Sequence, residues 1–125
     1  MTTTEIQDHD GFKSAMELWK RDTLFSSSTT EICNHKCFDT LTKLGESIIP
    51  KLLVDLAEYP WVGTCALLAT IVKEIPFEVE KQDYGRLDII ASTWLWWGLE
   101  AGYYESEQYQ ELITKLNNCL KEARK

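Results

Sequence analysis

The sequence predicts an all-α fold, a compact domain of five to six helices, and three observations support this prediction. Apolar residues recur at helical spacing along most of the 125-residue chain, and no segment reads convincingly as a strand. The apolar fraction of 44% with 26% charged residues is ordinary for a globular protein. The length suits one domain, residues 1–125, with enough chain to bury a core.

The first two helices are expected over residues 10–25 and from Ser28 to Leu44. In the first, Phe12, Met16 and Trp19 share one apolar face. Ser28 followed three residues later by Glu31 matches a capping box, and Asn34 is a competing cap. Gly45 is expected to end the second helix in a left-handed conformation. The apolar side of this helix is supplied by Ile32, Cys37, Phe38, Leu41 and Leu44.

A third helix is expected over residues 47–57, after a short turn. Pro50 falls in its first turn, where a missing N–H removes no intrahelical hydrogen bond. So short a connection predicts that the second and third helices pack as an antiparallel αα-hairpin. The apolar stripe consists of Ile48, Ile49, Leu52, Leu53 and Leu56.

The second half of the chain predicts three more helices. Residues 61–73 are mostly apolar and favour a buried helix ending before Pro76, with a strand as the weaker alternative. Residues 76–85 mix charges without a period and predict an irregular surface loop. Residues 86–102 are apolar on most sides, which predicts a central helix. Residues 105–124 keep strict helical spacing and predict an amphipathic helix, while residues 1–9 are expected to be flexible.

Charge and composition exclude several classes of function. The formal net charge of −7, with scattered basic residues, argues against nucleic acid as a partner. No apolar run reaches the roughly 18 residues that a membrane-spanning helix needs, and the first residues lack the features of a secretory signal. These features predict a cytoplasmic protein that does not bind membranes. The four cysteines are expected to be free, buried thiols.

Two resemblances follow from short motifs. Residues 38–53 contain a Leu44-Gly45 corner followed by Ile49-Pro50-Lys51-Leu52-Leu53, and this hairpin resembles a HEAT-type repeat. The motifs Thr30-Glu31-Ile32-Cys33-Asn34-His35, Leu44-Gly45, Ile49-Pro50 and Trp94-Leu95-x-Trp97-Gly98 resemble those of a family of small bacterial proteins without an assigned function. This second resemblance covers residues 28–104 and implies a cytoplasmic helical domain. It assigns no catalytic residue.

The cluster Cys33, His35 and Cys37 allows one chemical hypothesis. Thiolate and imidazole groups are zinc ligands, and a thiol beside an imidazole can be activated as a nucleophile. On a continuous helix, however, His35 would point away from the two cysteines, and the bacterial family has Pro-Ala in place of Lys36-Cys37. A small enzyme or zinc-dependent protein using these three residues is therefore the alternative interpretation.

The favoured function is a non-catalytic protein-interaction module, with no cofactor. Trp94 and Trp97 can share one face of a helix, whereas Trp96 lies on the opposite side. Trp96 is then either covered by a terminal helix or exposed with Tyr103 and Tyr104 as a docking patch. The chain would then act as an inhibitor or adaptor of another protein, or would pair with a second copy of itself in a homodimer. The candidate interaction residues are Trp96, Tyr103, Tyr104, Phe77, Glu78, Glu80 and Asp83.

Overall fold

The computed structural model describes residues 11–26, 28–73 and 86–123, and every regular element in these ranges is helical. Within the described ranges, six helices have nine or more residues, in agreement with the predicted five to six, and one shorter helix and a 3-10 turn are also present. The elements are α2 (Phe12–Asp22), α3 (Thr29–Cys33), α4 (Lys36–Leu44), η1 (Gly45–Ile48), α5 (Ile49–Glu58), α6 (Val62–Val72), α7 (Leu87–Glu100) and α8 (Ser106–Ala123). The all-α fold class is confirmed.

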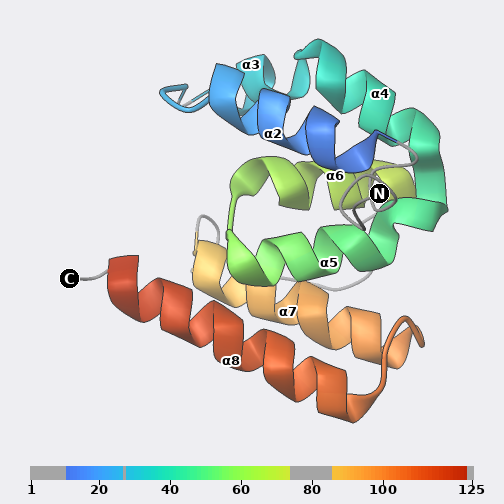
Figure 1. Ribbon diagram of the computed structural model, residues 1–125, viewed down its shortest axis with the longest axis vertical. Helices are drawn as coiled ribbons and strands as arrows, with labels where there is room; N and C mark the ends of the chain where they lie inside the picture. Colours follow the sequence, from blue (N-terminus) through green and yellow to red (C-terminus); the bar gives the residue numbers. More distant parts are fainter. Residues whose placement is uncertain (1–10, 27, 74–85, 124–125) are drawn as a thin grey trace, which may run out of the picture.

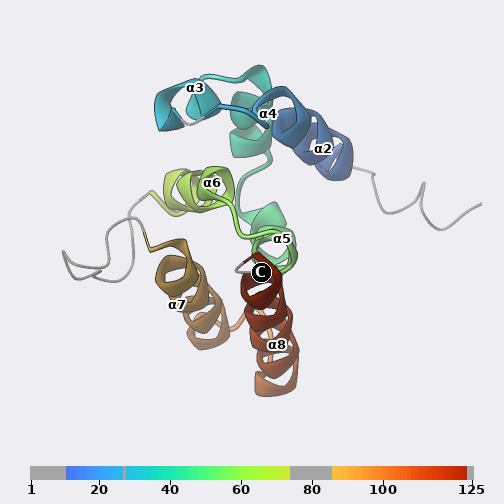
Figure 2. The same cartoon turned by 90° about the vertical axis from the view of Figure 1, so that its left-hand side faces the viewer.

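The helices are stacked in layers. Helices α2, α3 and α4 lie at one end, α6 and α5 follow, and α7 and α8 form the other end (Figure 1). Helix α5 packs on α6, α7 and α8, and α6 connects the first layer to the rest through contacts with α3 and α4 (Figure 2). The core is continuous through these layers. Its largest fully buried side chains include Trp19, Leu41, Ile49, Leu53, Leu67 and Leu95.

The first layer is organised around Trp19. This side chain is fully buried, and its indole Nε1 donates a hydrogen bond of 2.8 Å to the carbonyl of Ile32. Its ring makes edge-on contacts with Phe38 and Trp61, so α2 is held to α4 and to the start of α6. The Ser28 hydroxyl accepts the N–H of Glu31 at 3.3 Å, which confirms the predicted helix start.

The segment 28–44 differs from the expected single helix. The chain leaves helical geometry at His35, so the segment forms two helices, α3 and α4. Asn34 ends the first and His35 begins the second, because the ring of His35 accepts the N–H of Cys37. A side chain that caps the backbone in this way competes with continuation of the helix. Gly45 ends α4 with a positive φ of 69°, but its ψ of −151° lies outside the left-handed helical region that the sequence predicts, and the chain leads into η1.

Helices α4 and α5 do not pack on each other as the expected antiparallel hairpin. Helix α4 lies against α2 and α6, whereas α5 lies against α8, α7 and α6. Figure 1 shows α6 between α4 and α5. The 3-10 turn η1 separates the two helices and carries Ile48 into the core, which allows α6 to occupy the position expected for a hairpin partner.

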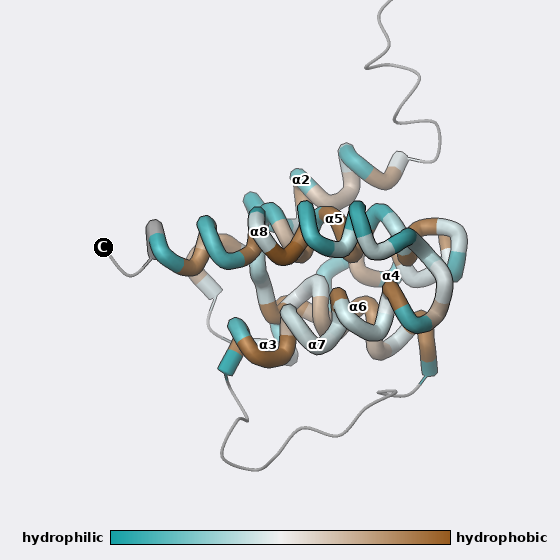
Figure 3. The backbone as a smooth tube through the Cα atoms, turned by 90° about the horizontal axis from the view of Figure 1, so that it is seen from below, coloured by the Kyte–Doolittle hydropathy of each residue, from teal (hydrophilic) through white to brown (hydrophobic). Residues whose placement is uncertain are grey.

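The tryptophan-rich helix α7 is not at the centre, contrary to expectation. Helix α5 occupies that place, with its predicted stripe from Ile48 to Leu56 buried. Helix α7 buries one side, Ala91, Trp94, Leu95 and Gly98, and leaves the opposite side partly exposed. Helix α8 packs on α7, and hydrophilic and hydrophobic residues both occur along its length (Figure 3).

The remaining expectations concern the ends, the loop and the thiols. Helix α6 is confirmed as a buried helix, and it ends at Val72 before Lys73, whose φ is 77°.

The expected loop 76–85 and the expected flexible residues 1–9 lie outside the described residues. All four cysteines are free, but only Cys37 is buried, and the other three are partly exposed. No helix in the described ranges has the length and apolar character to cross a membrane.

Candidate functional site

One partly exposed apolar surface lies along α7 and α8, and we call it the α7–α8 face. At one end Trp96 is 48% exposed, and its ring centroid lies 5.5 Å from that of Tyr109 with the rings at 72°. The helices are antiparallel, so residues before Trp96 on α7 face residues after Tyr109 on α8 (Figure 1). The face comprises Ile89, Ser92, Trp96, Tyr109, Ile113, Asn117 and Leu120.

A pocket marks the other end of the α7–α8 face. Its volume is about 370 Å³, and it opens between the start of α7 and the end of α8. Asp88 at its edge is paired with Arg86 at 2.9 Å, and this hydrogen bond lowers the pKa of Asp88. Apart from members of the face itself, the pocket is lined by Asp88 and Lys121. The surface therefore combines a half-exposed indole with a hollow.

Acidic side chains flank Trp96 and Tyr109. Glu100 lies four residues after Trp96, on the same side of α7, and it is exposed. Glu105 lies one turn before Tyr109, because its carbonyl accepts the N–H of Tyr109 at 3.0 Å. Glu107 and Glu111 are also exposed, but each is two residues from Tyr109 and so lies on the opposite side of α8. This end of the face is therefore apolar and negatively charged.

Tyr104 does not belong to an exposed patch, and this prediction was wrong. Only 7% of Tyr104 is exposed, and its hydroxyl donates to the carbonyl of Leu95. The cause is the end of α7. Gly102, with a φ of 88°, reverses the chain, and the N–H of Tyr103 bonds to the carbonyl of Gly98 at 3.0 Å. This reversal directs Tyr104 into the core, where burial raises the pKa of its hydroxyl.

Tyr103 lies on a different surface from Trp96, so the structure does not bring the predicted aromatic residues together. Its ring contacts Trp97 at 5.5 Å between centroids. Tyr103 also lines an open groove of about 720 Å³ between α2, α5 and the start of α8, which we call the α2–α5–α8 groove. The groove is lined by Phe12, Lys13, Pro50, Lys51, Val54, Asp55, Glu58, Tyr103, Tyr104 and Gln108.

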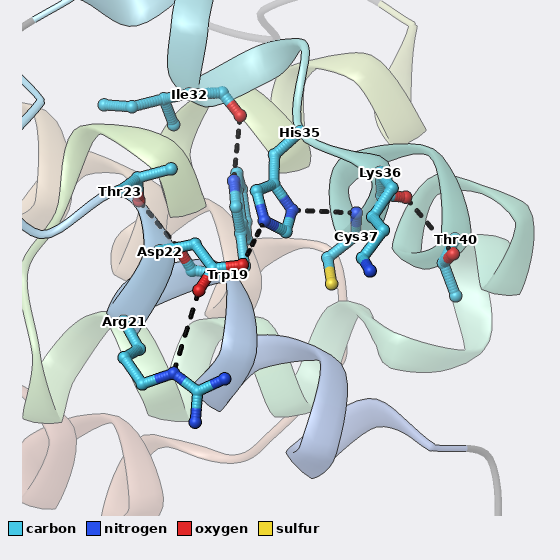
Figure 4. Close-up of polar contacts among 9 residues, drawn as sticks. All are labelled: Trp19, Arg21, Asp22, Thr23, Ile32, His35, Lys36, Cys37 and Thr40. Carbon is cyan, nitrogen blue, oxygen red and sulfur yellow. Dashed lines mark hydrogen bonds and ion pairs between the residues drawn. The ribbon is translucent and has the colours of Figure 1, made fainter.

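Two members of the predicted cluster, His35 and Cys37, take part in hydrogen bonds that hold the start of α4 (Figure 4), and Cys33 is the last residue of α3. His35 accepts the N–H of Cys37 through Nδ1 at 3.0 Å, and its Nε2 lies 2.8 Å from a carboxylate oxygen of Asp22. Burial raises the pKa of both thiols, which disfavours the thiolate that nucleophilic attack needs. Within the described ranges no group of three or more His, Cys, Asp or Glu is arranged to hold a metal ion.

Sequence reasoning missed Tyr109, which in the sequence is an ordinary apolar position of the last helix. Its significance comes from its ring contact with Trp96 on a different helix. The other candidate residues, Phe77, Glu78, Glu80 and Asp83, lie outside the described part of the chain. Comparisons with protein families, with curated proteins and with solved structures find no match to this chain.

Proposed function

We propose that this protein is a non-catalytic interaction module that binds a basic, amphipathic helix of another protein on the α7–α8 face. The observation that carries the proposal is the exposure of Trp96, of which 48% remains accessible beside Tyr109. Tryptophan and tyrosine are enriched among the residues that dominate binding energy. An indole held in place by a second ring can enter an interface with little loss of side-chain entropy.

The shape of the face favours a helical partner. Two antiparallel helices leave a shallow groove between them, and an amphipathic helix can lay its apolar side into such a groove. Helix α7 has 14 residues, which corresponds to about 21 Å of contact length at 1.5 Å per residue. Trp96 and Tyr109 would together contact apolar side chains of the partner at one end of the face, and Ile89 would contact the partner about two helical turns away.

The charge of the face favours a basic partner. Glu100 and Glu105 flank the aromatic pair, and the whole chain carries a formal net charge of −7. Such a field accelerates the approach of a positively charged partner and disfavours an acidic one. Lysines or arginines at the border of the partner's apolar stripe would therefore lie next to these carboxylates.

A labelled peptide tests this proposal. We expect an amphipathic helical peptide of leucine and lysine to bind in a fluorescence-anisotropy titration, and its leucine–glutamate counterpart to bind far more weakly. Trp96→Ala should weaken binding about thirty-fold, the equivalent of about 2 kcal/mol for a hot-spot residue. Phe25→Ala is the matched control, because Phe25 is 96% exposed but lies on the α2–α3 connection.

Three results would overturn this proposal. Equal binding of both peptides would remove the charge argument, and an equal effect of Phe25→Ala would remove Trp96 as the anchor. If sedimentation velocity shows concentration-dependent dimerisation and Trp96→Ala abolishes it, the partner on this face is a second copy of this chain and not a helix of another protein.

We also propose that the chain works in the cytoplasm and is related to the small bacterial proteins that it resembles. The shared motifs coincide with structural positions: Pro50 lies in the first turn of α5, and Gly98 lies against Leu53 and Tyr104. These are positions where the fold restricts the side chain. Free thiols are typical of cytoplasmic proteins, and all four cysteines are free.

A further inference from the structure

We propose that the pocket at the end of the α7–α8 face binds a tryptophan side chain of the partner helix, two helical turns from the apolar residue that contacts Trp96. This inference rests on the proposed function and specifies the partner. The pocket has a volume of about 370 Å³. Aromatic side chains that fill such pockets supply much of the binding energy of an interface. The lining residues are Asp88, Ile89, Ser92, Asn117, Leu120 and Lys121.

The residue spacing on the α7–α8 face fits a third helix that lies along α7 and α8. On α7, Ile89, Ser92 and Trp96 follow one another at intervals of three and four residues. The members of the face on α8, from Tyr109 to Leu120, are also three or four residues apart. Rows with this spacing run along a helix, so a third helix packs on them when its axis is nearly aligned with theirs. Ile89 lies two turns, or about 10.5 Å, from Trp96, so the two partner residues are about seven positions apart.

The charges at the border of the pocket favour a neutral occupant. The two carboxylate oxygens of Asp88 accept hydrogen bonds from Arg86 at 3.1 and 2.9 Å. Lys121 lines the same pocket, so groups of both signs stand at its border. A cationic side chain would meet the ammonium and an anionic side chain would meet the carboxylate, and each would lose hydration on entry. An uncharged side chain avoids both costs.

The walls of the pocket favour an indole among the uncharged side chains. Ile89 and Leu120 are half-buried and offer apolar contacts. The Ser92 hydroxyl donates to the carbonyl of Ile89 at 3.0 Å, so its oxygen is left only to accept a hydrogen bond. The side-chain amide of Asn117 can also present its oxygen. An indole combines a large apolar ring with one N–H donor, and it fills the pocket better than a phenol does.

Labelled peptides with one variable residue test this assignment in a fluorescence-anisotropy titration. Each is a leucine–lysine amphipathic helix that carries tryptophan, naphthylalanine or alanine about seven positions from a fixed leucine of the apolar stripe. Tryptophan should bind about tenfold more tightly than alanine, and about threefold more tightly than naphthylalanine, which has a similar ring but no N–H. Moving the tryptophan by two positions onto the polar side of the same peptide should lower its affinity to that of the alanine peptide.

Two substitutions at Ser92 separate the hydrogen bond from the filling of the pocket. Ser92→Ala should remove the preference for tryptophan over naphthylalanine and keep the preference of both over alanine. Ser92→Phe should fill the pocket and bring all three peptides to the affinity of the alanine peptide, while the far-UV circular dichroism stays unchanged. Thr40→Phe is the matched control, because Thr40 is an exposed residue of α4 whose hydroxyl also bonds to a carbonyl of its own helix, that of Lys36 at 3.2 Å.

Equal affinity of the three peptides, or a preference for tryptophan that persists in Ser92→Phe, would overturn the assignment. Trp96→Ala distinguishes this result from a failure of the proposed function. If Trp96→Ala weakens binding while the variable residue has no effect, helix recognition stands and the pocket has no part in it. If Trp96→Ala leaves the binding of every peptide unchanged, both proposals are wrong.

Discussion

His35 connects α2 to the start of α4 through both nitrogens of its ring. Nδ1 accepts the N–H of Cys37 at 3.0 Å, so this nitrogen carries no proton, and Nε2 is left to donate to Asp22 at 2.8 Å. The bond from His35 is the main cause that lowers the pKa of Asp22. A histidine between two cysteines thus caps a helix, which explains why α3 and α4 are separate.

We predict that His35→Ala lowers the free energy of unfolding by about 1 kcal/mol, the usual cost of losing an N-cap. His35→Asn should lose less, because asparagine caps helices well but is too short to keep both contacts. Urea denaturation of the three proteins measures the difference. Equal losses for alanine and asparagine would show that the cap contributes little.

A carboxyl-carbon NMR titration gives an independent readout of the same contact. The midpoint for Asp22 should lie below its ordinary value of 3.8 and should rise in His35→Ala. A group whose pKa is lowered in the folded state stabilises the folded protein at pH values above the pKa of the unfolded chain. This stabilisation is lost as the pH falls through the folded-state pKa. An unchanged midpoint in the variant would contradict the assignment.

At the scale of elements, α7 approaches α5 closely because Gly98 has no side chain. A Cβ built at Gly98 would lie 2.7 Å from a methyl carbon of Leu53 and 2.5 Å from the hydroxyl of Tyr104. The same close approach places the Tyr104 hydroxyl on the Leu95 carbonyl. The contact between these two helices and the turn after α7 therefore depends on one glycine.

We predict that Gly98→Ala destabilises the protein by about 1–3 kcal/mol through overpacking, even though alanine is the better helix former. Ser92→Ala, on the partly exposed side of the same helix, should change stability by only a few tenths of a kcal/mol. Thermal and urea unfolding of both variants measure this. The cost of Gly98→Ala should shrink in a Tyr104→Phe background, and strict additivity would contradict the proposed clash.

At the scale of the whole molecule, one polar network ties the first helical layer to the rest. Lys20 of α2 pairs with Asp55 of α5 at 2.6 Å, and the Thr64 hydroxyl of α6 lies 3.5 Å from the second oxygen of that carboxylate. Both charged side chains are only about one fifth exposed, at 21% and 20%. Burial raises the pKa of Asp55, while its bond to Lys20 opposes this effect.

We predict that Lys20→Met lowers the free energy of unfolding at pH 7 by about 1–3 kcal/mol, because it leaves a largely buried carboxylate without its cation. Since the folded pKa of Asp55 is raised, its contribution to stability is present below the unfolded value and lost as pH rises through the folded pKa. Urea denaturation at several pH values should therefore show a smaller deficit near pH 3 than near pH 7. A deficit that does not vary with pH would contradict this account.

Some features set by neighbouring residues could be predicted from the sequence, but the local cap of Cys37 by His35, which separates α3 from α4, was missed, as were features set by distant partners. Pro50 and the Ser28 cap act within one turn, so both were identified correctly. The packing of α4 on α2 and α6, and the pairing of Trp96 with Tyr109, require the relative positions of whole helices. Tyr104 points into the core because the chain reverses at Gly102, and the spacing of apolar residues in the sequence does not reveal this reversal.

The unequal exposure of the five tryptophans gives the protein an internal optical reporter. Trp19 and Trp94 are buried, Trp61 and Trp97 are half-buried, and Trp96 is the most accessible to water. A cationic quencher such as caesium will therefore reach Trp96 first, and the long-wavelength part of the emission will come mainly from this residue. Shielding of that component on mixing with a tryptophan-free ligand would report that this indole had become covered, without any added dye.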